Sequence, residues 1–257
     1  MIQRISGAFA SRHDFRIHPH PGPTPGAELP FGIGGKSGSL RAAIFGVNDG
    51  LVSNLSLIMG ISGAALENRF IVLAGVAGLL AGAFSMGWGE FVSMKSQREL
   101  FERLLHLEAH ELATEPEEEH AELREIYERR GYPPELAQQV TDVVMRDPEV
   151  ALETHAREEL GLDPEELGAP WGAALSSFIT FSLGALIPLI PFLIGSGVGA
   201  KLWAVGTSAV ALATVGASIS LLTGRHPWWS GIRMMLGGGL AAAVTFGVGR
   251  LFHVSTG

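Results

Sequence analysis

Three pairs of potential metal ligands recur in this sequence at spacings that place both members on one face of a helix. The pairs are Glu108 with Glu111, Glu119 with Glu122, and His155 with Glu159. If the three helices face one another, the pairs form a cluster of carboxylate oxygens and one imidazole, as in metal sites of helical bundles. Such a ligand set suits hard or borderline divalent cations such as Fe²⁺ and Mn²⁺. The alternative is that acidic runs such as EPEEEH are ordinary solvated helix surface, and spacing alone leaves both interpretations open.

A second set of reactive side chains lies in apolar sequence. Asp49, in FGVNDGLVSN, is surrounded by small and apolar residues, and an ionisable side chain in such a place usually lines a cavity or pathway. Met86, Glu90 and Met94 are four apart and form a stripe, although a thioether can also be packing material and Glu90 lies near water. One carboxylate cannot satisfy a divalent ion, whereas two chains related by a two-fold axis supply two Asp49 and two Met86. The sequence therefore predicts a homodimer with an ion pathway at its interface.

The elements that position these residues follow from an uneven distribution of charge. Of the 257 residues, 47% are hydrophobic and 17% are charged, and the mean hydropathy is +0.28. Glu and Arg are dense from Met94 to Asp163 and scarce on either side, which is typical of a membrane protein with one soluble insertion. The net charge of −8 argues against nucleic acid as a partner and favours cations. The absence of cysteine excludes disulfides, thiolate zinc sites and cysteine nucleophiles.

Five windows reach the roughly 20 apolar residues that a helix needs to cross a bilayer. They are Leu40–Leu66, Phe70–Met94, Trp171–Ile194, Ala200–Leu222 and Gly231–Phe252. Two prolines, Pro188 and Pro191, fall inside the third window and predict a kink there. Residues 1–39 have no continuous apolar core and are rich in Gly, Pro and His towards their end, so we expect a disordered tail and no signal peptide.

The predicted fold class is all-α, an integral membrane protein with five transmembrane helices and a helical metal-binding domain inserted between the second and third. The first two spans occupy 40–94, the inserted domain 95–169 and the last three spans 170–257. No helix breaker follows Met94, so the second span is predicted to continue into the inserted domain as one long helix. Three further helices are expected there, opened by prolines at 116, 133–134 and 148.

The distribution of Lys and Arg near the span ends predicts the orientation of the chain. Basic residues are more numerous on the side that holds the N-terminus and the insertion, so both are expected to face the cytosol. The Ala- and Gly-rich spans and the lack of a presequence fit a prokaryotic inner membrane.

Three long motifs resemble the vacuolar iron transporter family. They are RAAIFGVNDGLVSNLSLIMGISGA, GLLAGAFSMGWGEFVSMKSQREL and EELGLDPEELGAPWGAALSSFITFSLGALIPLIPFL. The resemblance implies a five-span homodimer that exports Fe²⁺, and often Mn²⁺, from the cytosol in exchange for protons. It further implies that Asp49 and Met86 line the pathway. The residues that match the five glutamates of the cytosolic metal-binding domain are Glu108, Glu111, Glu119, Glu122 and Glu159.

This sequence departs from the family pattern at several positions that bear on function. His155 stands where the pattern has methionine, which makes the site harder and more dependent on pH. Gly78 replaces a membrane glutamate of the plant type, and Ala42 follows Arg41 where some members have aspartate. Glu90 stands where the plant type has glycine, which makes it a candidate proton carrier.

The sequence thus predicts a divalent-metal/proton antiporter that needs no cofactor and carries Fe²⁺ as its cargo. Glutamate oxygens also bind Mn²⁺, Co²⁺ and Zn²⁺, so the sequence does not rank these ions. A membrane-anchored metal sensor or buffer is the alternative, since it would need the cytosolic glutamates but not Asp49. An intramembrane enzyme is weaker, because the spans contain no recognisable nucleophile motif.

Overall fold

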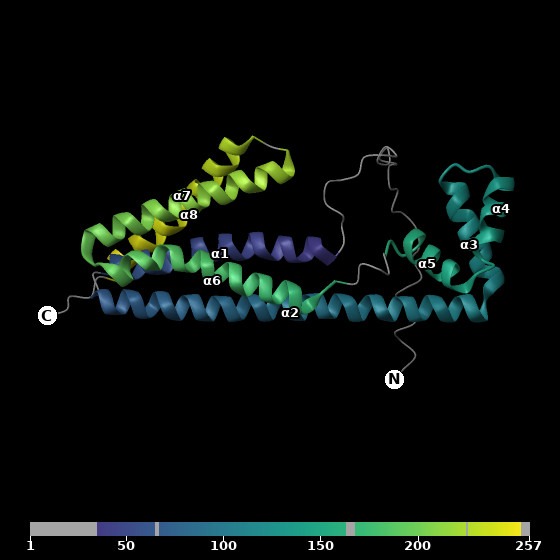
Figure 1. The fold of residues 1–257 in the computed structure, drawn as a ribbon, viewed down its shortest axis with the longest axis horizontal. Coiled ribbons are helices and arrows are strands. Elements are labelled where there is room, and N and C mark those ends of the chain that lie inside the picture. The colour runs from purple at the N-terminus through teal and green to yellow at the C-terminus, as the bar shows by residue number, and fades with distance from the viewer. Residues whose placement is uncertain (1–34, 65–66, 163–167, 225, 253–257) are drawn as a thin grey trace. The chain divides into compact units, whose positions relative to one another are not determined.

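All regular structure in the described part of the chain is α-helical. The computed structural model describes residues 35–64, 67–162, 168–224 and 226–252, so the predicted tail lies outside the described residues as far as residue 34. The helices in chain order (Figure 1) are α1 Gly35–Gly63, α2 Asn68–Thr114, α3 Pro116–Arg129, α4 Pro134–Val144, α5 Pro148–Glu158, α6 Pro170–Ile194, α7 Gly197–Thr223 and α8 Pro227–Leu251. The all-α prediction is confirmed.

Five of these helices are long and apolar enough to cross a membrane. Their candidate spans are Arg41–Gly63, Asn68–Thr114, Pro170–Ile194, Gly197–Ser220 and Pro227–Leu251. Each overlaps one of the five windows read from the sequence, so the prediction of five transmembrane helices is confirmed.

The second span and the insertion share one helix. α2 has 47 residues without interruption, as expected from the lack of a breaker after Met94. At 1.5 Å per residue it is about 70 Å long, more than twice the roughly 30 Å hydrocarbon core of a bilayer. Figure 1 shows α2 as one continuous ribbon, and its second half contacts α3 and α5. A side chain in the span and one in the insertion are therefore attached to the same element.

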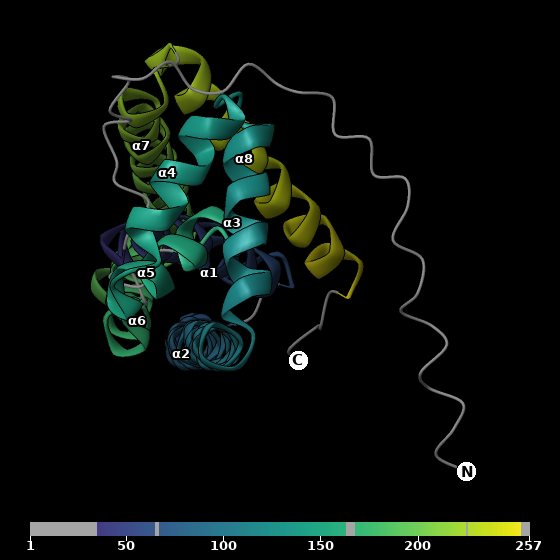
Figure 2. The same ribbon diagram turned by 90° about the vertical axis from the view of Figure 1, so that its right-hand side faces the viewer.

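Local signals start and stop the short helices of the insertion. Proline occupies the first turn of α3, α4 and α5, where its missing N–H costs nothing. Asp147 caps α5, because its side chain accepts a hydrogen bond of 3.0 Å from the backbone N–H of Glu149. Gly131 and Gly161 follow α3 and α5 with φ of 94° and 65°, which glycine adopts most readily. Figure 2 shows α3 and α4 side by side as a hairpin.

Glycines bring α1 and α6 into close contact. A Cβ on Gly50 would lie 2.2 Å from the carbonyl oxygen of Phe181, and one on Gly184 would lie 2.3 Å from that of Val47. Small residues allow such an approach between helix backbones in a membrane. The contact fixes the part of α1 that carries Asp49.

Side-chain amides from α1 and α2 bind backbone carbonyls of α6. The buried Asn54 donates through Nδ2 to the carbonyl of Ala185 at 2.7 Å, and Asn68 donates to that of Phe192 at 3.0 Å. Helix α6 continues through both of its internal prolines, and the kink expected there stays a prediction. These bonds stabilise the packing because a bilayer core offers no water to satisfy the side-chain amides.

We expect Gly50→Ala to lower the thermal stability of the purified protein. The new methyl group would meet backbone atoms of α6, which cannot turn aside, and overpacking of this kind costs about 1–3 kcal/mol. Gly206→Ala in α7 is the matched control, since nothing lies within 4 Å of a Cβ at that position. Thermal unfolding in detergent measures both variants, and equal midpoints would contradict the tight contact between α1 and α6.

Candidate metal centre

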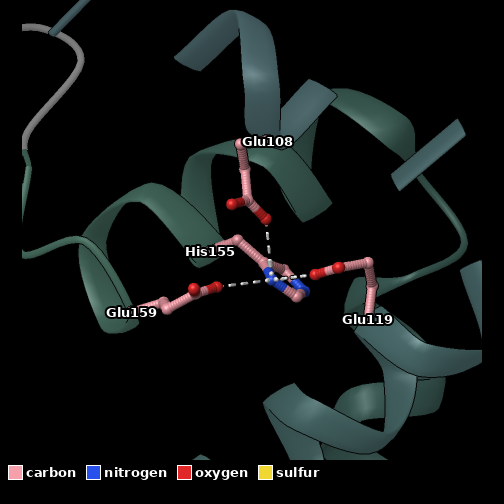
Figure 3. Close-up of side chains that lie close together, drawn as sticks. All are labelled: Glu108, Glu119, His155 and Glu159. Carbon is pink, nitrogen blue, oxygen red and sulfur yellow. Dashed lines mark ion pairs between the residues drawn. The ribbon is translucent and has the colours of Figure 1, made fainter. Parts of the chain in front are cut away.

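Side chains from three helices converge in the insertion (Figure 3). Glu108 comes from α2, Glu119 from the first turn of α3, and His155 and Glu159 from the end of α5. Each offers one ligand atom, and these atoms all lie within 4.8 Å of one another. We refer to these residues as the four-residue cluster.

The imidazole of His155 is the centre of the cluster. Its Nδ1 lies 3.0 Å from Oε1 of Glu108, 3.3 Å from Oε2 of Glu119 and 3.7 Å from Oε2 of Glu159. In a neutral ring protonated at Nε2, the lone pair of Nδ1 faces three oxygen acceptors. Either a proton or a cation must therefore lie between these atoms for the arrangement to be favourable.

Three members of the cluster are buried, and two of them, Glu108 and His155, have unsatisfied polar atoms. The exposed fraction is 2% for Glu108, 7% for Glu119 and 0% for His155. Within the described residues, Oε1 of Glu108 and both ring nitrogens of His155 lack a hydrogen-bond partner of good geometry, although Nδ1 lies 3.0 Å from Oε1. Leaving each such atom unpaired costs roughly 1–3 kcal/mol, and more for a charged group. The donor set fits a divalent cation, which would satisfy the atoms that face Nδ1.

Burial and crowding of negative charge raise the pKa values of the cluster. Burial, reinforced by the charge of Glu108 and opposed by His155, raises the pKa of Glu119 from 4.5 to about 7. Burial and the charges of Glu108 and Glu122 also raise the pKa of Glu159. Burial by itself lowers the pKa of His155, but the contact with Glu108 and the neighbouring carboxylates outweigh it, so the pKa lies above its ordinary 6.5. The cluster thus holds protons near neutral pH, and a cation must displace them.

Comparison with known proteins identifies the family. The sequence profile of the VIT family matches residues 40–250, which include the five spans and the whole insertion. The chain belongs to the VIT family.

Curated members of the VIT family align over most of their length with this chain. It is 33% identical over 212 residues to vacuolar iron transporter 1 of Oryza sativa subsp. japonica, an alignment that covers 82% of this chain and 84% of the relative. Identity is 35% over 221 residues to the vacuolar iron transporter of Acanthamoeba castellanii, covering 84% and 80%. Identity is 32% over 232 residues to the vacuolar iron transporter of Toxoplasma gondii, an alignment that covers 85% of this chain and 76% of the relative. The resemblance read from the motifs is confirmed.

Two of the predicted ligands of this VIT-family chain stay outside the four-residue cluster. Glu111 and Glu122 are both exposed, whereas Glu108 and Glu119, three residues earlier on the same helices, point at the imidazole. Glu122 still acts at a distance, because its charge contributes to the raised pKa values of Glu119 and Glu159.

The residues predicted to line the pathway of this VIT-family protein occupy two helices. Asp49 is exposed on α1, in one stripe with Arg41 and Phe45, which precede it by eight and four residues. Met86 is half-buried and packs against buried apolar side chains of α2 and α6, and Glu90 is half-buried one turn further along α2. A single chain does not enclose Asp49.

Sequence reasoning missed a polar contact beside the cluster of this VIT-family chain. Nε2 of His120, in α3, lies 2.7 Å from Oδ1 of Asp142, in α4, and Nε2 of Gln138 donates to the same oxygen at 2.8 Å. The hydrogen bonds from both neighbours lower the pKa of Asp142. The contact joins residues 22 apart on separate helices, and no helical spacing in the sequence indicates it.

Proposed function

We propose that this protein exports ferrous iron, and manganese, from the cytosol across a membrane in exchange for protons. As a member of the VIT family it is a transporter and not an enzyme. The observation that carries the proposal is the buried four-residue cluster, whose unsatisfied atoms suit a divalent cation and whose Glu108 belongs to the same helix as the second span. The names of the relatives, all vacuolar iron transporters, support iron as the ion.

The cluster and the span have separate roles in this proposal. The cluster, with the surrounding acidic surface that includes Glu111 and Glu122, collects cations and raises their concentration at the cytosolic mouth. Asp49 and Met86 bind the ion in transit. A carboxylate exposed on a transmembrane helix is costly to leave facing lipid, which supports covering Asp49 with the same face of a second chain.

Proton exchange follows from competition for the same carboxylates. Metal ligands must be deprotonated to bind, so a proton that enters from the far side displaces the ion. Asp49 and Glu90 are the candidate carriers. The excess of basic residues beside α2 and α1 supports placing the insertion and the N-terminal side in the cytosol.

Flux measurements in proteoliposomes with an imposed pH gradient test the proposal. Fe²⁺ or Mn²⁺ should move only with an opposing proton gradient, and Glu90→Gln should uncouple the two fluxes if Glu90 carries the proton. Glu117→Gln, which alters an exposed carboxylate outside the cluster, is the matched control. Metal flux that ignores the pH gradient would overturn the exchange mechanism.

The distance between the two sets of ligands also supports a second function. Glu108 and Glu90 are 18 residues apart on α2, which is about 27 Å at 1.5 Å per residue. An ion cannot pass directly from the cluster to the span, so the cluster could serve a membrane-anchored sensor or buffer. Such a protein would bind metal and show no flux.

The affinity of the cluster for a divalent cation is expected to rise as pH rises through about 7. Raised pKa values mean that His155 and Glu119 hold protons more tightly in the folded than in the unfolded chain. For Glu119, this contribution to the stability of the metal-free protein is complete below pH 4.5 and lost as pH rises through about 7. Over the same window the cation gains deprotonated ligands.

Mn²⁺ titrations on either side of neutral pH measure this dependence. Each proton displaced should contribute up to about tenfold in affinity per pH unit. His155→Met removes the imidazole proton, so its titration should depend less steeply on pH than that of the wild type. An affinity that does not change with pH would contradict the raised pKa values.

A further inference from the structure

Charged groups occupy the place of a hydrophobic core where α5 meets α2 and α3. The buried apolar clusters of the described residues lie among the spans or between α3 and α4, and none of them contains a residue of α2 beyond Met94. The most deeply buried side chains where α2, α3 and α5 meet include Glu108 and His155, at 2% and 0% exposure. Ala151, Ala156 and Leu162, in α5 or just after it, are buried as well, at 3%, 0% and 9% exposure. Two of the three are alanines, which bury little apolar area, so hydrophobic burial stabilises the docking of α5 only modestly.

The α3–α4 hairpin, in contrast, is held by its own contacts. Leu123, Tyr127 and Ala137 form a buried apolar cluster, with three more partly buried side chains of the hairpin against it. The contacts of Asp142 with His120 and Gln138 add a polar link between the two helices. The hairpin keeps its structure whether or not a cation is bound nearby.

The four-residue cluster opposes docking when it holds no cation. When its three carboxylates are ionised they face a single imidazole, so the net charge is negative even if the ring is protonated. Like charges buried together repel, and an unpaired buried carboxylate is strongly destabilising. An ion pair between Arg130 and Glu158 also links α5 to the end of α3, but the exposed fraction of the Arg130 side chain is 50%, so this pair is worth little.

We infer that a divalent cation docks α5 onto α2 and the α3–α4 hairpin, so that the insertion closes when metal is bound and opens when it is not. The inference rests on the proposed metal binding at the four-residue cluster. Ligands from all three helices meet at one point, so a single ion joins them. The second span and the first part of the insertion belong to the same helix, α2. Opening or closing of the insertion therefore acts directly on the helix that carries Met86 and Glu90.

Thiol labelling tests the inference, since the chain contains no cysteine. Ala151 lies one turn before His155 on the same face of α5 and is 3% exposed, so Ala151→Cys places a single thiol in the closed junction. Ala137→Cys, at 0% exposure inside the α3–α4 hairpin, is the matched control. Each variant of the full chain is labelled with a maleimide, in chelator and in Mn²⁺, while free Mn²⁺ in the same sample is measured by its paramagnetic signal.

If only the closed form binds the ion, Mn²⁺ at 100 times its Kd should slow labelling of the Ala151→Cys thiol about 100-fold. Labelling of the Ala137→Cys thiol should not change, and adding Glu108→Gln should remove the protection of the Ala151→Cys thiol. If Mn²⁺ binds but does not slow labelling of the Ala151→Cys thiol, metal-driven docking is overturned, whereas the proposed metal site is not. Absence of Mn²⁺ binding to either variant and to the wild type would overturn both proposals.

Discussion

Replacing Asp49 with alanine is expected to reduce proton-coupled Fe²⁺ flux by at least about 100-fold, equivalent to about 2.7 kcal/mol in the barrier to ion movement. In a homodimer each substitution removes two carboxylates from the same point of the pathway. No other acidic residue of α1 can replace them, because Asp49 is the only Asp or Glu in that helix. Fe²⁺ flux into proteoliposomes under a fixed pH gradient measures the loss.

Two further variants separate charge from shape at this position. Asp49→Asn keeps the size of the side chain and removes its charge, so it should lose flux nearly as completely. Ser53→Ala alters the next position along the exposed stripe of α1 and should retain flux. The affinity of the four-residue cluster for metal should be unchanged in all three variants, since the cluster lies on other elements. Normal flux in Asp49→Ala would remove Asp49 from the transport pathway.

The helices could be predicted because their signals are local. α2 contains no proline from Asn68 to Thr114, and the short helices of the insertion begin at prolines. The boundaries were less accurate. α8 begins at Pro227 and not at Gly231. Its N-cap His226 and its first-turn residues Trp228 and Trp229 lie outside an apolar window yet form a helix end suited to a membrane interface.

The composition of the candidate site could be predicted only in part. Spacing identified the pair of Glu108 and Glu111 and the pair of Glu119 and Glu122, but residues three apart on a helix differ by about 60° in direction. Which member points inward depends on how each helix is rotated by its tertiary contacts. The structure turns Glu108 and Glu119 towards His155 and leaves the other two exposed.

The surroundings of Asp49 and His155 depend on packing that no local pattern encodes. The sequence predicts that Asp49 is costly in an apolar helix, but the stripe that it shares with Phe45 is exposed because α6 packs on a different side of α1, through Gly50. The unsatisfied nitrogens of His155 likewise arise from the meeting of three helices. The sequence therefore predicts which residues could serve as ligands, whereas tertiary packing determines which of their atoms lack hydrogen-bond partners.

Glu108→Gln is expected to weaken Mn²⁺ binding to the insertion by about 100-fold or more, since even loss of a partner that only orients a ligand costs about 10–100-fold. The amide keeps the shape of the side chain but removes the negative charge nearest to Nδ1 of His155. The site is buried, so no exposed carboxylate can move in to replace it. Titration of the purified protein with Mn²⁺ at a pH above 7 measures the affinity.

Glu111→Gln is the matched control, because it makes the same chemical change one turn further along α2 at an exposed position. It should weaken binding only severalfold, through the loss of a screened surface charge. High salt should reduce the effect of Glu111→Gln and leave that of Glu108→Gln nearly unchanged, since buried charges are screened much less. Equal losses of affinity in the two variants would mean that the acidic surface attracts the ion and that the four-residue cluster does not ligate it. The comparison therefore distinguishes coordination by specific side chains from attraction by the overall negative charge of the insertion.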